Sequence, residues 1–267
     1  EKYAPNPSDL FYIIGTEVPI PGGETEEPDA LNLTSVERFH DTIETHRTAF
    51  AFRGLDNAWS RIISVVTQPG VDFGHTSIYP FISEKAKPLS KAILEIDKLT
   101  FEAHSTDYQS NTALKALTQN HFFFLKVGPE LTFRFREAIW ALAEIEEQIS
   151  VNETSEIRNV LIHRMIESPA NWKNYYSGLD DDVEQLMVYS YSDRIRYYWS
   201  DKYVASALSK LIINLSSKLL PETLISQSFM GHEFGNIPTN PNHLIEGHIH
   251  KCVNRYFEAA GFNYRNN

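Results

Sequence analysis

Four short apolar runs in the first half of the chain each lead directly into polar residues or a glycine-proline turn. The four segments are Phe11-Tyr12-Ile13-Ile14-Gly15-Thr16-Glu17, Ile62-Ile63-Ser64-Val65-Val66-Thr67-Gln68-Pro69-Gly70, Leu99-Thr100-Phe101-Glu102-Ala103-His104 and Phe122-Phe123-Phe124-Leu125-Lys126. An α/β barrel builds the rim of its active site from side chains at the carboxyl ends of buried parallel strands. The pattern therefore predicts an α/β fold with a ring of site residues, which comprises Glu17, Gln68, Glu102, His104, Asp107 and Lys126.

Strands and helices alternate through this half of the chain, which favours a mostly parallel sheet. We expect strands at residues 10–17, 61–67, 100–103 and 122–126, and helices at 88–94 and 112–118. Thr34 and Glu37 form a capping-box pattern that predicts a helix extending to about Phe52. Four such strand–helix units make half of an eight-stranded barrel.

From about Thr132 the pattern becomes helical. Apolar residues recur at steps of three and four, as expected for one face of a helix. They are Phe135, Ile139, Leu142, Ile145 and Ile149. Further helices are expected near 155–167, 202–217 and 242–257. We therefore expect residues 1–150 to form the barrel strands with their helices. Residues 151–267 would form a helical extension packed on the barrel, within a single domain.

Charge and cysteine content restrict the partners. The formal net charge of −11 argues against nucleic acid, which requires a basic surface. A phosphate-bearing ligand would need local arginine or lysine against this background. The single cysteine, Cys252, excludes a disulfide within the chain and favours a reducing compartment. No apolar run approaches the length of about 18 residues that a membrane span needs, so we expect a cytoplasmic protein without a membrane partner.

The residues at the strand ends resemble the tagatose-1,6-bisphosphate aldolase Z-type subunit family. The stretches that carry the resemblance are 14–23, 68–73, 101–109, 125–129 and 189–199, and the last reads Tyr-Ser-Tyr-Ser-Asp-Arg-Ile-Arg-Tyr-Tyr-Trp. The resemblance implies a (β/α)8 barrel with extra C-terminal helices, of which this chain would match only the C-terminal part, from about the fifth strand. It also implies a role beside a class II aldolase catalytic subunit in galactitol or amino-sugar catabolism, as part of an oligomer.

Two functions follow from this resemblance. The first is an accessory subunit that supports the activity and stability of the aldolase without cleaving sugar itself. The second is a divalent-metal ketose or ketose-phosphate enzyme, either an aldolase or a 4-epimerase, with zinc or a similar metal. In that second function Glu17 and His104 would bind the metal, and this chain would supply an incomplete site. Glu102 would transfer protons.

Each candidate residue also has a structural interpretation. Glu17 could bond to loop amides or to an arginine, and His104 could be a hydrogen-bonded core residue. Asp107 could contact a sugar hydroxyl or cap the following helix, because aspartate suits that position. Lys126 could bind a substrate oxyanion or pair with Glu17 or Glu102.

The remaining candidates are neutral or cationic. Gln68 could orient a polyol through hydrogen bonds. Arg194, Arg196 and Asp193 are expected to bind substrate, and the two arginines could bind a sugar phosphate, because guanidinium groups bind phosphate in a bidentate manner. Alternatively, Asp193 and Arg194 could form a structural ion pair that connects the C-terminal helices to the barrel.

Overall fold

A computed structural model describes residues 3–15, 31, 33–149, 151–231 and 235–262. The chain divides into two compact units, one formed by residues 1–127 with 255–267 and the other by residues 128–254. This division falls earlier than the boundary at residue 150 that the sequence suggests. The reason is that helix α5 (Pro129–Gln148) contacts α6 (Ile157–Glu167), α8 (Lys202–Ser216) and α9 (Glu222–Ser228).

The first unit contains a parallel sheet. Its strands are β1 (Tyr12–Ile14), β2 (Ile62–Val66), β5 (Thr100–Ala103) and β6 (Phe122–Leu125), in the order β1-β2-β5-β6. Every neighbouring pair is parallel, so the predicted α/β class with a parallel sheet is confirmed. Within the described residues this sheet has four strands, and a complete barrel is not confirmed.

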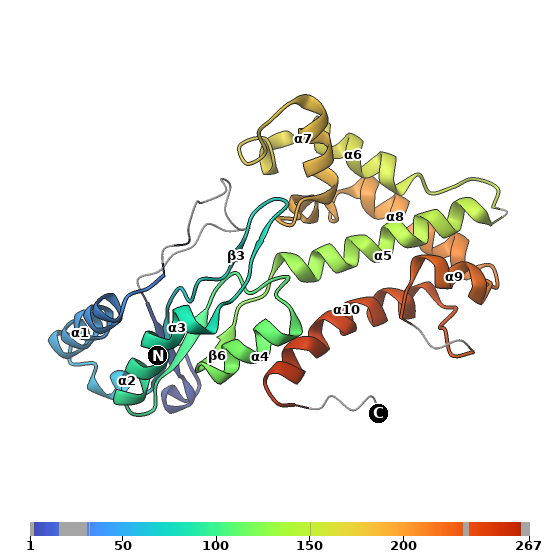
Figure 1. The fold of residues 1–267 in the computed structure, drawn as a ribbon. Helices are drawn as coiled ribbons and strands as arrows, with labels where there is room; N and C mark the ends of the chain where they lie inside the picture. Colours follow the sequence, from blue (N-terminus) through green and yellow to red (C-terminus); the bar gives the residue numbers. More distant parts are fainter. Residues whose placement is uncertain (1–2, 16–30, 32, 150, 232–234, 263–267) are drawn as a thin grey trace. The chain divides into compact units, whose positions relative to one another are not determined.

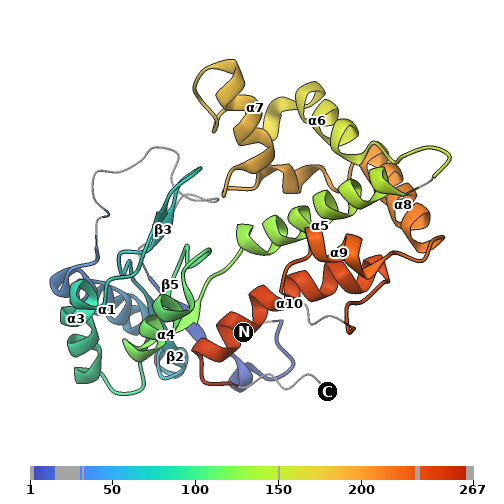
Figure 2. The ribbon, with the colours of Figure 1, turned by 45° about the vertical axis from the view of Figure 1, so that its right-hand side comes forward.

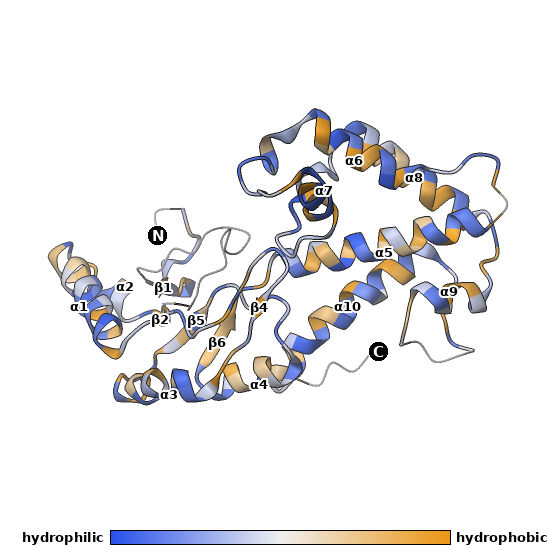
Figure 3. Cartoon of the chain, turned by 45° about the horizontal axis from the view of Figure 1, so that its top comes forward, coloured by the Kyte–Doolittle hydropathy of each residue, from blue (hydrophilic) through white to orange (hydrophobic). Residues whose placement is uncertain are grey.

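Helices connect the strands and cover one face of the sheet. They are α1 (Val36–Phe52), α2 (Asp56–Trp59), α3 (Ser83–Ala92) and α4 (Asn111–Gln119), with the 3₁₀ helix η2 (Ile93–Glu95) after α3. Phe39, Leu89 and Leu114 from these helices share one buried cluster with Val65 and Phe101 of the strands. Figures 1 and 2 show the helices beside the strands, and Figure 3 shows hydrophobic residues along β5 and β6.

Two local expectations need correction, and one pair of strands was missed. The N-cap of α1 is Ser35, whose hydroxyl accepts a hydrogen bond from the backbone of Arg38. The neighbouring Thr34 instead accepts one from the backbone of Gln68. Helix α3 begins at Ser83 and contains Pro88 in its interior, so the proline does not mark its start. A short antiparallel pair, β3 (Asp72–Phe73) with β4 (Ile78–Tyr79), had not been predicted.

The second unit is helical. Besides α5, α6, α8 and α9 it contains α7 (Asp180–Tyr189), the 3₁₀ helices η3 (Pro169–Asn171) and η4 (Arg194–Tyr198), and most of α10 (Pro241–Ala259). The predicted stripe on α5 is confirmed, because Ile139, Leu142 and Ile145 are fully buried in the core of this unit. In the described part of the chain, no helix has the length and apolar content needed to cross a bilayer.

Gly15 is the site of a close approach between the end of β1 and β2. A Cβ atom at this position would lie 2.6 Å from the Cβ atom of Val66. We expect Gly15→Ala to lower the free energy of unfolding by about 1–3 kcal/mol, because the extra methyl group clashes with the side chain of Val66 and must displace it. Urea denaturation measures this change.

Gly247→Ala provides the matched control. Gly247 lies in α10, and a Cβ atom there would meet nothing within 4 Å. Alanine favours a helix by up to about 1 kcal/mol relative to glycine, so this variant is expected to be more stable than the wild type. Equal effects of the two substitutions would contradict the close approach at Gly15.

Candidate functional site

Glu102 is the centre of a charged cluster at the carboxyl end of β5. Its side chain is 4% exposed, and its Oε1 atom lies 2.8 Å from Nε2 of His104 and 3.5 Å from Nζ of Lys126. Glu102 and His104 are two residues apart, so they project from the same face. Lys126 follows β6, the neighbouring parallel strand, and reaches the same carboxylate. The parallel sheet thus brings together three residues that the strand-end pattern had selected.

The three side chains differ in their access to solvent. Lys126 is 60% exposed, so its pair with Glu102 is not the fully buried ion pair considered from the sequence. His104 is partly buried. The second carboxylate oxygen of Glu102 is buried and has no hydrogen-bond partner among the described residues. The cluster therefore offers one carboxylate oxygen that is already bonded and one that is not.

The loop after β5 contacts the chain beyond β6 and the C-terminal end of α10, which belongs to the first unit. Thr106 donates from its hydroxyl to the carbonyl oxygen of Lys126 at 2.7 Å, and the Tyr256 hydroxyl donates to the carbonyl oxygen of Thr106. Asp107 is buried. It does not cap α4, because Ser110 is the N-cap and accepts from the backbone of Ala113.

Gln68 stabilises its own turn. Its Oε1 atom accepts hydrogen bonds from the backbone amides of Gly70 at 2.9 Å and Val71 at 3.0 Å. The side-chain oxygen is therefore engaged by the backbone that follows β2. Gln109, which we had not selected, makes a similar bridge from its buried side chain to the backbone of Phe81 and Tyr79.

The described residues do not by themselves fit a divalent metal. Catalytic zinc sites have three protein ligands, and Glu102 and His104 supply two candidate donors. No group of three or more histidine, cysteine, aspartate or glutamate side chains in the described residues is arranged to hold a metal ion. Glu17, the other predicted ligand, lies outside the described residues.

The second unit contains the other predicted residues, and Asp193 is fully buried there. Its Oδ1 atom accepts from Nε of Arg136 at 3.1 Å, and its Oδ2 atom accepts from the Thr132 hydroxyl at 2.6 Å. Burial raises the pKa of Asp193, while the hydrogen bond from Thr132 and the charge of Arg136 oppose that rise. The partner of Asp193 is thus Arg136 on α5, and the structural pair of Asp193 with Arg194 is wrong.

Arg194 and Arg196 bind backbone and aromatic groups of their own unit. Nε of Arg194 donates to the carbonyl oxygen of Asn171, and its guanidinium lies 3.3 Å from the ring centroid of Tyr175. Arg196 donates to the carbonyl oxygens of Ser192 and Asp193. Arg194 is buried, so its guanidinium organises the segment around η4. Phosphate binding by these two residues stays a prediction.

A second charged group on α5 includes Glu137, which accepts from Arg134 at 2.8 Å and lies 3.0 Å from Nε2 of His248. Burial acts to raise the pKa of Glu137, but hydrogen bonds from His248 and Arg134 outweigh it, and the pKa is lowered. The charged form of Glu137 therefore stabilises the fold above its unfolded pKa of about 4.3. This contribution is lost as the pH falls through the lower, folded-state value.

We expect Glu137→Gln to lower the free energy of unfolding by about 1 kcal/mol at pH 5.5, since a charged hydrogen-bonded pair is lost. The difference from the wild type should shrink as the pH falls from about 4.3 toward 3. Urea denaturation at several pH values measures it. Glu147→Gln, on an exposed residue of the same helix, is the control. A pH-independent difference would contradict the assigned ion pair.

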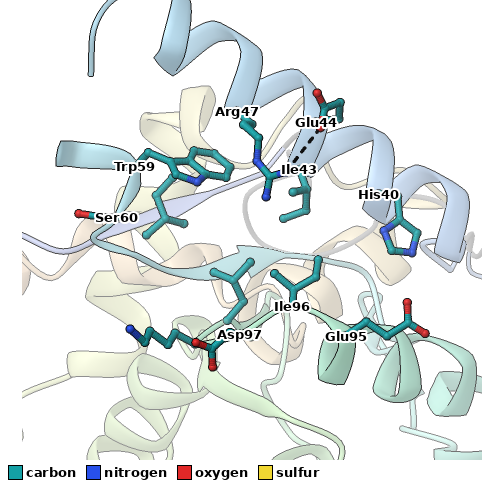
Figure 4. Close-up of a pocket in the computed structure, with 12 residues that line it drawn as sticks. His40, Ile43, Glu44, Arg47, Trp59, Ser60, Glu95, Ile96 and Asp97 are labelled. Atoms are coloured by element: carbon teal, nitrogen blue, oxygen red, sulfur yellow. Dashed lines mark ion pairs between the residues drawn. The ribbon is translucent and has the colours of Figure 1, made fainter. Parts of the chain in front are cut away.

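A cavity of about 700 Å³ lies at the opposite end of the sheet, between α1 and the amino ends of β2 and β5 (Figure 4). Arg47 extends over the ring of Trp59, 5.4 Å from its centroid, and lies 3.9 Å from Glu44. Glu95 and Asp97 line the other side. Parallel sheets bind ligands at their carboxyl ends, so the Glu102 cluster is the better candidate site.

The model of the family described as D-tagatose-1,6-bisphosphate aldolase subunit GatZ/KbaZ-like matches residues 1–261. The chain belongs to this family. The narrower expectation, that the likeness is to the C-terminal part of the family only, is not borne out.

One solved structure is similar to the GatZ/KbaZ-like chain in both sequence and fold. It is described as a probable tagatose 6 phosphate kinase from Sinorhizobium meliloti 1021 and is 36% identical, with a TM-score of 0.84. The match covers 93% of this chain and 62% of the relative, so the chain spans less than two thirds of that protein. A fructuronate-tagaturonate epimerase from Cohnella laeviribosi aligns at 10% identity and a TM-score of 0.39, covering 87% of this chain and 44% of the epimerase.

Arg136 is a buried charged residue of the second unit that the sequence analysis did not select. Among the described residues it has the largest of the fully buried side chains, and it neutralises Asp193. Its position three residues before Ile139, on the apolar side of α5, was the available signal. A charged residue on a buried helical stripe requires a partner, because an unpaired buried charge is strongly disfavoured.

Proposed function

We propose that the chain is an accessory subunit of a class II D-tagatose-1,6-bisphosphate aldolase and supports the activity and stability of the catalytic subunit. The observation that carries this proposal is the family match over residues 1–261, since the family description names a subunit of that aldolase. The proposal includes a sugar phosphate as the ligand of the assembly, an oligomeric state and a place in cytoplasmic carbohydrate metabolism.

The arrangement of the Glu102 cluster supports an accessory role. The Oε1 atom of Glu102 is already engaged by His104 and Lys126, which suits a group that maintains the shape of the strand ends. Gln68 and Thr106 likewise bond to neighbouring backbone. These contacts stiffen the carboxyl end of the sheet, where a partner or ligand would meet the chain.

Reconstitution with a class II tagatose-bisphosphate aldolase catalytic subunit tests the proposal. We expect the full chain to raise the cleavage rate of the catalytic subunit and to slow its loss of activity on warming. The full chain alone should cleave no substrate, and serum albumin at equal mass is the control for crowding. An unchanged rate and an unchanged half-life would reject the accessory role.

The second candidate is a metal-dependent ketose or ketose-phosphate enzyme, either an aldolase or a 4-epimerase. One observation favours it: a carboxylate, an imidazole and an ammonium group gather at the carboxyl ends of two neighbouring strands. In this proposal Glu102 transfers protons and Lys126 binds a substrate oxyanion. Glu17 and His104 would contribute to a metal site, and Asp107 and Gln68 would contact the substrate.

Activity of the chain alone distinguishes this candidate. Tagatose 1,6-bisphosphate would be supplied with zinc, manganese or magnesium, and both cleavage and epimerisation would be followed. Activity that Glu102→Gln abolishes, and that Glu84→Gln leaves intact, would support it. Glu84 is an exposed residue of α3 that pairs with Lys87 at 3.2 Å and is the matched control. No turnover with any of the metals would reject the enzyme.

A further inference from the structure

A cavity of about 550 Å³ lies entirely within the second unit and along one face of α5. Residues of α5 that line it recur at helical spacing, from Phe133 through Arg136 and Trp140 to Glu144. Phe229 and His248 contribute from the end of α9 and from α10. Figures 1 and 2 both show α10 beside α5, in agreement with the contact between His248 and Glu137. The volume is in the range of small-molecule sites.

Two arginines of this cavity have unused hydrogen-bond donors. Arg136 is 2% exposed, and its Nη2 atom is buried without a partner among the described residues, although its Nε atom bonds to Asp193. Arg158, at the start of α6, donates from Nη2 to the carbonyl oxygen of Trp140 at 2.7 Å. Its Nε atom is also buried and unpartnered within the described part of the chain. Buried donors of this kind normally form hydrogen bonds, and each donor that lacks a partner lowers the stability of the fold.

The charge around these donors favours an anion. Arg134 pairs with Glu130 and Glu137, and Arg136 pairs with Asp193, so among the arginines of the lining the charge of Arg158 is the one that no carboxylate of the described residues pairs with. Glu137 is engaged by Arg134 and His248. Arg158 has no carboxylate within ion-pair distance among the described residues, which leaves its charge for a ligand.

Aromatic rings line the same cavity and favour a ligand with a flat, apolar part. The guanidinium of Arg136 lies 4.2 Å from the ring centroid of Phe133, and that of Arg158 lies 5.8 Å from the ring centroid of Trp140. Tyr189 and Phe229 also contribute to the lining. An anionic group could thus meet the arginines while a ring of the same molecule packs against these side chains.

We propose that this cavity binds a small molecule in which a phosphate or carboxylate group is attached to a ring. Arg158 and Arg136 bind the oxyanion through their unused N–H groups, since a planar guanidinium matches phosphate and carboxylate. The aromatic side chains contact the ring. The inference is independent of the accessory role, because it concerns the helical unit and not the strand ends of the sheet.

Calorimetry and tryptophan fluorescence on the full chain test the site, with phenyl phosphate, benzoate, inorganic phosphate and benzyl alcohol as probes. Trp140 lines the cavity and reports occupancy. We expect phenyl phosphate or benzoate to bind, and the better of the two to bind at least about tenfold more tightly than inorganic phosphate or benzyl alcohol. Arg158→Gln should weaken that binding by about tenfold, which corresponds to the loss of about 1.4 kcal/mol.

Arg164→Gln is the matched control on the same helix. Arg164 pairs with Glu167 and Asp201 and does not line the cavity, so this variant should bind the probes as the wild type does. Arg158 carries no carboxylate partner, which makes its variant safer for folding than a change at Arg136. Circular dichroism and the melting temperature verify that both variants are folded. Absence of binding by both ring anions, or equal binding by the wild type and Arg158→Gln, would overturn the proposal.

Discussion

Asp193→Asn is expected to lower the free energy of unfolding by about 3–5 kcal/mol, because it leaves Arg136 as an uncompensated buried charge. An arginine cannot lose its proton to escape this penalty. Asparagine keeps the size of the side chain and tolerates the left-handed backbone at this position, where φ is 45°. The substitution therefore changes the charge with little change in shape. Urea denaturation measures the loss of stability.

Hydrogen exchange measured on peptides locates the effect of Asp193→Asn. Faster exchange should appear in α5 and η4, which the Asp193–Arg136 pair connects. Glu153→Gln, which removes an exposed pair with Lys210 at 3.0 Å, is the control and should leave exchange nearly unchanged. Arg136→Met combined with Asp193→Asn should be more stable than Asp193→Asn alone, since no charge is then left unpaired. A double variant as unstable as the single one would contradict the buried ion pair.

Phe101→Ala is expected to lower the free energy of unfolding by about 3–5 kcal/mol. Phe101 lies on β5 and is fully buried, 4.9 Å from the ring centroid of Phe122 and 5.4 Å from that of Phe39. Its ring joins two neighbouring strands to α1, so its removal leaves a cavity with packed walls on several sides. Urea denaturation with hydrogen exchange across the strands measures the loss.

Phe123→Ala is the matched control for this prediction. Phe123 lies on the adjacent strand β6, but its side chain is 60% exposed. Removal of an exposed ring far from a core contact changes stability by no more than about 0.5 kcal/mol. A loss at Phe101 no larger than that at Phe123 would show that the sheet does not depend on the stacked aromatic cluster.

The local sequence pattern predicted the strands and the Glu102 cluster well. A short apolar run followed by polar residues identified β2, β5 and β6, because a buried strand must be apolar and must end where polar groups begin. The spacing of Glu102 and His104 predicted one shared face, and their hydrogen bond confirms it. Pro88 was a poorer guide, because α3 continues through it.

The sequence pattern could not predict hydrogen-bond and ion-pair partners that lie far apart in the sequence. The structural alternative paired Asp193 with its neighbour Arg194, whereas its carboxylate bonds to Arg136, 57 positions earlier in the chain. Gln68 was considered as a residue that orients a polyol, and in the structure its Oε1 atom bonds to the turn that follows it. In both cases the type of side chain correctly predicted that it forms hydrogen bonds. Which partner it bonds to depends on the residues that the tertiary structure brings next to it.

The apolar periods and the strand-end residues were sufficient to specify the α/β class of the first unit and the helical character of the second, because both depend on neighbours a few positions apart. The family followed from motifs of the same local kind. Tertiary structure alone decided that Arg136 is buried against Asp193, that Lys126 reaches Glu102 from the next strand, and that Arg158 lines a cavity with α5. Charges are paired across space, and the energy of burying them depends on which groups packing brings within hydrogen-bond distance.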